Sequence, residues 1–282
     1  MNDSITVNWQ KLLTRILLYF VVTLICVVIL YPYFTMTVTA LKSRAEIFSI
    51  NGTVMPIEVK WSNFADIWEK APMMRYMVNS FIMATSGTLI RLVFSVCAAY
   101  GLTHYDFKGK NFLFFLVLGT MMLPGDTLLI TNYITVSKMG LLNTYLGMII
   151  VSFVSASQMF MLRQKFLSIP KDLRHAAMLD GCGDLRYIAT VLLPICKPIL
   201  TTLFVQSFIA MWNAYLWPLI VTASSPEMRT IMVGITKLNS WEDTNYELVL
   251  AGVTISLIPS FILFMIMRRN MTKGGTDGAL VG

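Results

Sequence analysis

Long apolar stretches constrain this chain more than any other feature of its sequence. Four of them contain no Asp, Glu, Lys or Arg: 16–41, 139–162, 198–226 and 248–267. A helix of about 20 apolar residues crosses the hydrocarbon core of a bilayer, so each stretch is long enough to span it. Two more stretches, about 79–103 and about 111–134, qualify with one ionisable residue each, Arg91 and Asp126. The pattern predicts an all-α integral membrane protein with six transmembrane helices.

Composition and charge support this fold class and give it an orientation. Apolar residues make up 56% of the chain and charged residues 13%, against roughly 45–50% and about 25% in soluble domains. This balance excludes a soluble enzyme, a disordered protein and a typical nucleic-acid-binding protein. The loops on one predicted side hold thirteen Lys and Arg against six acids, and those on the other side hold eight of each.

Short cytoplasmic loops are enriched in Lys and Arg, so we predict that both termini face the cytoplasm. The net charge of +7 is then a topology signal. The chain divides into a cytoplasmic N-terminus (1–13), a six-span transmembrane domain (14–267) with an internal loop at 163–197, and a cytoplasmic tail (268–282).

The internal loop at 163–197 is too long for a turn and too polar to cross the membrane. A helix is expected to begin at Ser168 or Pro170 and to end at Gly181, because glycine suits the left-handed residue that follows a helix. A second helix is expected to start near Gly183 or Asp184 and to stop at Pro194. We expect it to turn one apolar side towards the bilayer: Tyr187, Ile188, Val191 and Leu192.

This loop resembles the cytoplasmic loop of the membrane subunits of bacterial ABC importers. Those subunits carry Glu-Ala-Ala, then Asp-Gly, then an aliphatic residue and Leu-Pro. This chain has His175-Ala176-Ala177, then Asp180-Gly181, then Val191-Leu192-Leu193-Pro194 at the same spacing. Other landmarks are similar to the carbohydrate-uptake branch, in particular the maltose-type second permease: Asn79-Ser80, Ala99-Tyr100, Met122-Leu123-Pro124-Gly125, Gly140 to Tyr145, Trp212-Asn213 and Leu216-Trp217-Pro218.

The resemblance covers the chain from about residue 14 to its end, and it implies a fold and a set of partners. The fold is that of a type I ABC importer permease in a bacterial cell membrane. The partners are a homologous permease subunit, two copies of an ATPase subunit, and an external solute-binding protein. ATP and Mg would be bound by the ATPase, since this chain has no Gly-x-x-x-x-Gly-Lys-[Ser/Thr] phosphate cradle. The resemblance implies no catalytic residue, metal or cofactor on this chain, and no nucleic acid.

The same resemblance assigns contacts with the ATPase to the loop and the tail: His175, Ala176, Ala177, Asp180, Gly181 and Gly278. His175 stands where the family has glutamate, which places the contact at this position in question. The alternative is that 163–197 only packs beneath its own bundle.

A substrate path is expected where polar and aromatic residues lie deep in the third and fifth spans: Asp126, Trp212, Asn213, Tyr215 and Trp217. Asp126 and Asn213 are each about 15 residues from the cytoplasmic end, or roughly 22 Å at 1.5 Å per residue. Transporters place substrate near broken helices in the membrane, and aromatic faces suit a sugar. Alternatively, the aromatic residues form an interfacial belt, and Asp126 pairs with the second permease. Arg91 is expected to snorkel or to pair.

These residues predict half of the translocation pathway of an ATP-driven importer for a sugar or oligosaccharide. An ABC permease for a non-sugar solute, such as a glycerol phosphodiester or a polyol, remains open. An ion-coupled secondary transporter would fit the hydropathy but leaves the 163–197 loop without a purpose. A membrane enzyme would need a constellation of His or carboxylate residues that the spans lack.

Overall fold

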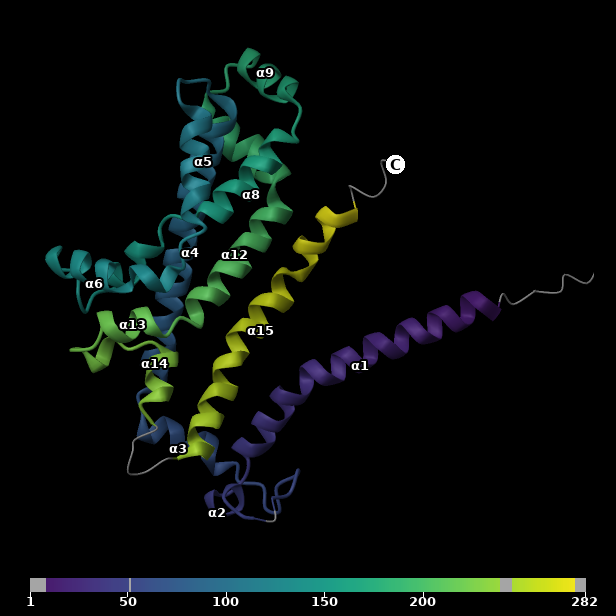
Figure 1. Ribbon diagram of the computed structural model, residues 1–282, viewed down its shortest axis with the longest axis vertical. Helices are drawn as coiled ribbons and strands as arrows, with labels where there is room; N and C mark the ends of the chain where they lie inside the picture. Colours follow the sequence, from purple (N-terminus) through teal and green to yellow (C-terminus); the bar gives the residue numbers. More distant parts are fainter. Residues whose placement is uncertain (1–8, 51, 239–244, 277–282) are drawn as a thin grey trace, which may run out of the picture. The chain divides into compact units, whose positions relative to one another are not determined.

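The computed structural model describes residues 9–50, 52–238 and 245–276, and every regular element in these ranges is helical. The chain divides into two compact units, one of Met1–Ala71 with Leu238–Ile255 and one of Pro72–Lys237 with Ser256–Gly282. The helix α15 (Tyr246–Thr276) begins in the first unit and continues in the second (Figure 1).

The first unit contains α1 (Trp9–Ala40), α2 (Arg44–Ile47) and α3 (Ser62–Lys70). Polar side chains organise the segment between α1 and α3. The Glu46 carboxylate accepts hydrogen bonds from the Thr53 hydroxyl (2.8 Å) and the Ile57 amide (3.0 Å). The Asn63 amide donates to the Ala40 and Lys42 carbonyls at 2.8 and 3.0 Å. This segment is therefore held by buried and partly buried hydrogen bonds, which is how an irregular backbone satisfies its polar groups.

The second unit is built around α4 (Met73–His104), against which α12 (Lys197–Trp212) and α8 (Ala156–Leu167) pack. The other elements of this unit follow in chain order: α5 (Lys110–Thr120), η1 (Gly125–Leu128), α6 (Leu129–Lys138), α7 (Tyr145–Ile149), η2 (Ile150–Ser152), α9 (Lys171–Leu179), α10 (Asp184–Tyr187), the π-helical turn η3 (Ile188–Leu192), α11 (Leu193–Ile195), α13 (Leu216–Val221), η4 (Pro226–Met228) and α14 (Ile231–Thr236). Within this unit, α9 lies at one end of α4, and α13 and α14 lie towards the other end (Figure 1).

Hydrogen bonds near the N-terminal end of α4 show what the landmark pair Asn79-Ser80 does in the fold. The Asn79 amide donates to the carbonyls of Glu227 and Arg229 at 2.8 and 2.9 Å, and its oxygen accepts from the Tyr145 hydroxyl at 2.6 Å. The Ser80 hydroxyl accepts from the Ile231 amide at 2.8 Å. Both residues thus fix the connection that leads into α14, which is a structural role.

The number of continuous spans differs from the six that the sequence predicts. Within the described residues, three helices are long and apolar enough to cross a membrane: Gln10–Ala40, Met73–His104 and Tyr246–Met271. Two more regions qualify only as bent pairs, Tyr145–Ser152 with Ala156–Leu167 (53°) and Asp184–Ile195 with Lys197–Trp212 (85°). The third predicted span contains the short helix Lys110–Thr120, and the helical turn η1 begins only at Gly125. Pro124 has no N–H to donate to the Thr120 carbonyl, which explains why the α-helix ends there.

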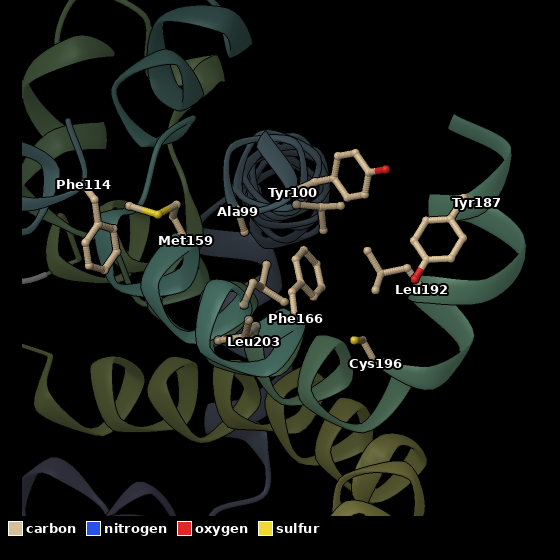
Figure 2. Packing of buried hydrophobic residues seen from close by; sticks show 11 residues of the cluster. Ala99, Tyr100, Phe114, Met159, Phe166, Tyr187, Leu192, Cys196 and Leu203 are labelled. Atoms are coloured by element: carbon tan, nitrogen blue, oxygen red, sulfur yellow. The ribbon is translucent and has the colours of Figure 1, made fainter. Parts of the chain in front are cut away.

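A buried cluster joins the 163–197 loop to the helices of the second unit, and it corrects one prediction. Tyr187 and Leu192 are 1% and 0% exposed, and they pack with Tyr100 and Phe166 in this cluster (Figure 2). They therefore do not face the bilayer. The π-helical turn at Ile188–Leu192 and the bend before α12 turn this side of the segment inwards, towards α4 and α8.

Candidate functional site

The loop helix α9 has a start and an end that its own sequence specifies. Pro170 stands immediately before Lys171–Leu179, as the sequence predicts. At the other end, the Cys182 amide donates to the Ala177 carbonyl (2.9 Å) and the Gly181 amide donates to the Met178 carbonyl (3.0 Å). Gly181 has a φ of +73°, in the left-handed region. This is a Schellman ending, and it confirms the predicted place of Gly181.

The outer surface of α9 and of the turn that follows it combines small, apolar and ionisable side chains. His175, Ala176, Asp180 and Gly181 are exposed, whereas Ala177 packs partly against the buried cluster. Large apolar residues beside them lack cover, in particular Leu179, which is 90% exposed, and Met178. An exposed apolar patch of this kind is typical of a surface that another protein covers.

A charged and hydroxylated cluster anchors α9 to the end of α4. The Arg174 guanidinium forms an ion pair with Asp184 (3.0 Å) and donates to the Tyr100 hydroxyl (3.2 Å). The Tyr100 and Tyr105 hydroxyls donate to the two oxygens of the same Asp184 carboxylate. One carboxylate therefore connects α9, α10 and the C-terminal end of α4.

These hydrogen bonds shift the pKa values of Asp184 and Tyr105. Hydrogen bonds from Tyr100, Tyr105 and Arg174 lower the pKa of Asp184 to about 2, because they stabilise the ionised carboxylate. The bond to Asp184 in turn raises the pKa of Tyr105. Asp184 is therefore a carboxylate at physiological pH.

The predicted substrate-path residues of the fifth span lie at a break in that span. The helix α12 ends at Trp212 and α13 begins at Leu216, so Asn213 and Tyr215 fall in the non-helical segment between them. Both side chains are exposed on this chain. An exposed amide and an exposed phenol at a helix break supply the donors and acceptors that a polar solute requires.

The two tryptophans of this segment are held by the protein itself. Trp212 is 1% exposed, and its indole N–H donates to the Ser256 carbonyl at 3.0 Å. The indole N–H of Trp217 donates to the Gly147 and Met148 carbonyls at 3.2 and 3.1 Å. In this conformation Trp212 faces the helix packing, and both indoles position the break.

The remaining predicted residues lie partly or wholly outside what the structure describes. Asp126 belongs to η1, but its side chain is not among those described, and Gly278 lies outside the described residues. The helix α6, which follows η1 directly, packs against α13. The start of α6 lies beside Ile220 and Ala223, at the C-terminal end of α13.

Arg91 pairs with a backbone carbonyl, whereas the sequence leaves both snorkelling and pairing open. Its Nε–H donates to the Ser152 carbonyl at 2.7 Å. Ser152 ends η2, where the bent pair of α7 and α8 is interrupted. The guanidinium thus satisfies a carbonyl that the broken helix leaves without an intrahelical partner.

Sequence reasoning missed the Asp184 cluster. Tyr100 entered only as a family landmark, and Asp184 only as a helix start. The signal within the loop was the pair Arg174 and Asp184, opposite charges on either side of the Gly181 turn. The two tyrosines are 84 and 79 residues from Asp184 along the chain, and no local pattern predicts such a contact.

The apolar helices, the broken spans and the exposed loop helix define a multi-pass membrane protein of the transporter class. Comparison with known proteins identifies the family within this class. Residues 91–273 match the family described as binding-protein-dependent transport system inner membrane component. The chain belongs to this family.

Curated relatives extend the similarity over most of the chain. The sn-glycerol-3-phosphate transport system permease protein UgpE of Yersinia pestis bv. Antiqua (strain Antiqua) is 31% identical over 257 residues, which cover 88% of this chain and 91% of that protein. The arabinooligosaccharides transport system permease protein AraQ of Bacillus subtilis (strain 168) is 29% identical over 271 residues, which cover 95% and 96%. The chain is thus similar to permeases of transport systems for a phosphorylated polyol and for oligosaccharides.

Solved structures support the fold. A chain of a bacterial ABC transporter involved in the import of the acidic polysaccharide alginate superposes with a TM-score of 0.79 at 21% identity, covering 92% of this chain and 97% of that one. A second structure, of a bacterial alginate ABC transporter in complex with alginate pentasaccharide-bound periplasmic protein, gives a TM-score of 0.67 at 14% identity, covering 94% and 98%. The helical architecture is that of an ABC importer permease.

Proposed function

We propose that this chain forms one half of the translocation pathway of an ABC importer, with six membrane crossings and both termini in the cytoplasm. The other half would come from a homologous permease subunit, and an external solute-binding protein would deliver the solute. Two copies of an ATPase subunit would bind ATP and Mg and hydrolyse ATP. Membership of the binding-protein-dependent transport family carries this proposal, and the similarity to UgpE over 88% of the chain supports it.

Within this assembly, α9 would be the element that docks on the ATPase. Its exposed small side chain Ala176 allows a partner surface to approach closely, and the uncovered Leu179 and Met178 provide apolar contact area. His175 lies on the same helix and Asp180 caps its end, and Gly278 in the tail would add a further contact. Closure of the ATPases would move α9, and Asp184 would transmit this movement to the end of α4.

The solute would pass the break between α12 and α13, where Asn213 and Tyr215 are exposed. Asp126 is proposed to line the same path, with Trp212 and Trp217 holding the break in place. A sugar or oligosaccharide is the solute class we favour, supported by the relative AraQ and by the exposed amide and phenol. A glycerol phosphate compound is the second candidate, favoured by the identity to UgpE.

The docking proposal can be tested with two matched tryptophan variants of the complex. Ala176 on α9 and Ala189 on η3 are both exposed alanines of the same loop. We expect Ala176→Trp to reduce the amount of ATPase subunit that co-purifies with the chain and to reduce ATP-driven uptake into proteoliposomes, whereas Ala189→Trp retains both. Normal association and uptake in Ala176→Trp would contradict docking through α9. Vanadate sensitivity of uptake separates an ABC importer from an ion-coupled transporter, which an ionophore would inhibit.

A further inference from the structure

The short helix α3 of the first unit has three sides of different chemistry. Trp61 precedes the first residue of the helix with helical backbone angles, and Phe64 and Trp68 follow three and seven positions later. These positions fall on one side of a helix, and we call the three residues the aromatic stripe. Asn63 and Ile67 are buried on a second side. The third side is charged and consists of Asp66, Glu69 and Lys70.

The aromatic stripe has no cover within the first unit. Trp61 is 70% exposed and Trp68 is 41% exposed, and the ring centroid of Trp61 lies 6.3 Å from that of the partly exposed Phe64. Exposed aromatic residues on one side of a helix and charged residues on another are typical of a helix that lies in a membrane surface. The stripe is therefore a candidate for contact with lipid.

The segment before α3 adds apolar surface to the stripe. Val54, Met55 and Ile57 are all exposed, Ile57 by 81%. The backbone of this segment is fixed, because the buried Glu46 carboxylate accepts hydrogen bonds from the Thr53 hydroxyl and the Ile57 amide. These apolar side chains are thus held outwards on an ordered loop.

Hydrogen bonds place the start of α3 beside the end of α1. The Lys60 amide donates to the Leu41 carbonyl at 2.8 Å, and the Asn63 side chain donates to the Ala40 and Lys42 carbonyls. Figure 1 shows α2 and α3 together at this end of α1. The helix α1 is long and apolar enough to cross a membrane, so the depth of its end in the bilayer also gives the depth of Trp61.

The length of α1 fixes this depth. Arg15 is the last charged residue before the apolar stretch 16–41, and an arginine at the end of a span extends its guanidinium to the headgroups. From Arg15 to Ala40 the helix rises about 38 Å at 1.5 Å per residue, or about 36 Å along the membrane normal with a tilt of about 20°. The hydrocarbon core takes up about 30 Å, and each headgroup layer a further 5–8 Å or so. The end of α1 therefore lies in the opposite headgroup layer, where tryptophan is enriched.

We propose that the aromatic stripe of α3 is a membrane anchor that contacts lipid at the boundary between headgroups and acyl chains. Apolar and aromatic contact provides the attraction, because residues 42–70 carry no net charge; they contain four bases and four acids: Lys42, Arg44, Lys60, Lys70, Glu46, Glu58, Asp66 and Glu69. The anchor holds the C-terminal end of α1 at the level of the headgroups. This proposal requires only that α1 crosses the membrane, and it does not rest on the proposed solute or on the ATPase.

The test measures tryptophan fluorescence of the full chain, with the subunits that co-purify with it, in phosphatidylcholine nanodiscs. The emission of Trp61 is obtained by subtracting the spectrum of Trp61→Phe, which keeps an apolar ring at this position. We expect lipid brominated near the headgroup to quench this emission roughly twofold more than lipid brominated near the end of its acyl chains, because an interfacial helix enters the bilayer by only about 5–10 Å. Trp212→Phe is the matched control, since the buried Trp212 indole should be quenched little by either lipid.

A second pair of variants tests what holds α3 at the membrane. Trp61→Ser combined with Trp68→Ser removes only exposed aromatic rings, and we expect it to speed hydrogen–deuterium exchange of the α3 amides in nanodiscs. Glu69→Lys alters the charged side of the same helix and is expected to leave this exchange unchanged. Replacing part of the phosphatidylcholine by phosphatidylglycerol is expected to leave the quenching of Trp61 unchanged.

Several results would overturn the proposal. Quenching of the Trp61 emission by aqueous iodide, but by neither brominated lipid, would assign the aromatic stripe to a soluble partner such as the solute-binding protein. Resistance to iodide and to both lipids would show that a second membrane subunit covers the stripe. Stronger quenching by the chain-end bromine, or quenching that requires phosphatidylglycerol, would refute the depth or the apolar basis of the contact. Because no measurement requires ATP or solute, failure of the proposed transport function would leave this result unaffected.

Discussion

Replacing Gly181 by valine tests whether the ending of α9 transmits force. The glycine has a φ of +73°, and a Cβ added there would meet no atom within 4 Å. The substitution therefore adds no clash, and its cost comes from the backbone alone. A left-handed conformation costs an L-residue about 1–2 kcal/mol, and more for a β-branched one.

A cost of this size changes the equilibrium between the intact and the unwound last turn of α9 by roughly 5–30-fold. Gly183 provides the matched control, because a Cβ there also meets open space, but its φ is −70° and its ψ is 164°, which valine adopts readily. Gly183 is the N-cap of α10, where valine is less favourable than glycine by about 0.5–1 kcal/mol, and this cost falls on the start of α10 and not on the end of α9.

The assay compares ATP hydrolysis with solute uptake in proteoliposomes, together with hydrogen–deuterium exchange of the amides of residues 176–182. We expect Gly181→Val to exchange faster at these amides and to take up less solute per ATP hydrolysed, whereas Gly183→Val behaves like the wild type. Equal coupling ratios in the two variants would refute the argument that the left-handed turn is needed for transmission.

Three further predictions concern charged groups. The pKa of Asp184 is lowered in the folded protein, so the ionised carboxylate stabilises the fold fully above its ordinary pKa near 3.9, and this stabilisation is lost as the pH falls towards about 2. After solvent screening is taken into account, the stabilisation amounts to about 1 kcal/mol. Asp184→Asn should accordingly flatten the acid dependence of α9 exchange, and an unchanged dependence would exclude Asp184 as its origin. Asp126→Ala is expected to abolish uptake while the ATPase still associates, and unchanged uptake kinetics would remove Asp126 from the path. His175→Glu is expected to be tolerated in uptake assays, because shape and apolar contact on α9 persist; a loss of ATPase association would show that the histidine itself is needed.

Much of the candidate coupling site follows from the sequence, because its determinants are local. Pro170 and Gly181 mark the ends of one helix through their own backbone preferences, and both are where the sequence predicts them. The apolar stretches likewise predict where helices form, since a bilayer span requires a minimum run of apolar residues. Family membership was also readable, because the spacing of the loop residues survives in this chain.

Tertiary packing decided what local patterns leave open. Tyr187 and Leu192 look like lipid-facing residues in sequence, yet the bend before α12 buries them beneath α4 and α8. Trp212 and Asn213 are neighbours in the chain, but the end of α12 places the first in the helix packing and leaves the second exposed. The contacts of Asp184 with Tyr100 and Tyr105 join residues about 80 positions apart. Apolarity and turn chemistry act over a few residues and so are written in the sequence, whereas the direction of a side chain and the identity of a distant partner depend on how the helices meet.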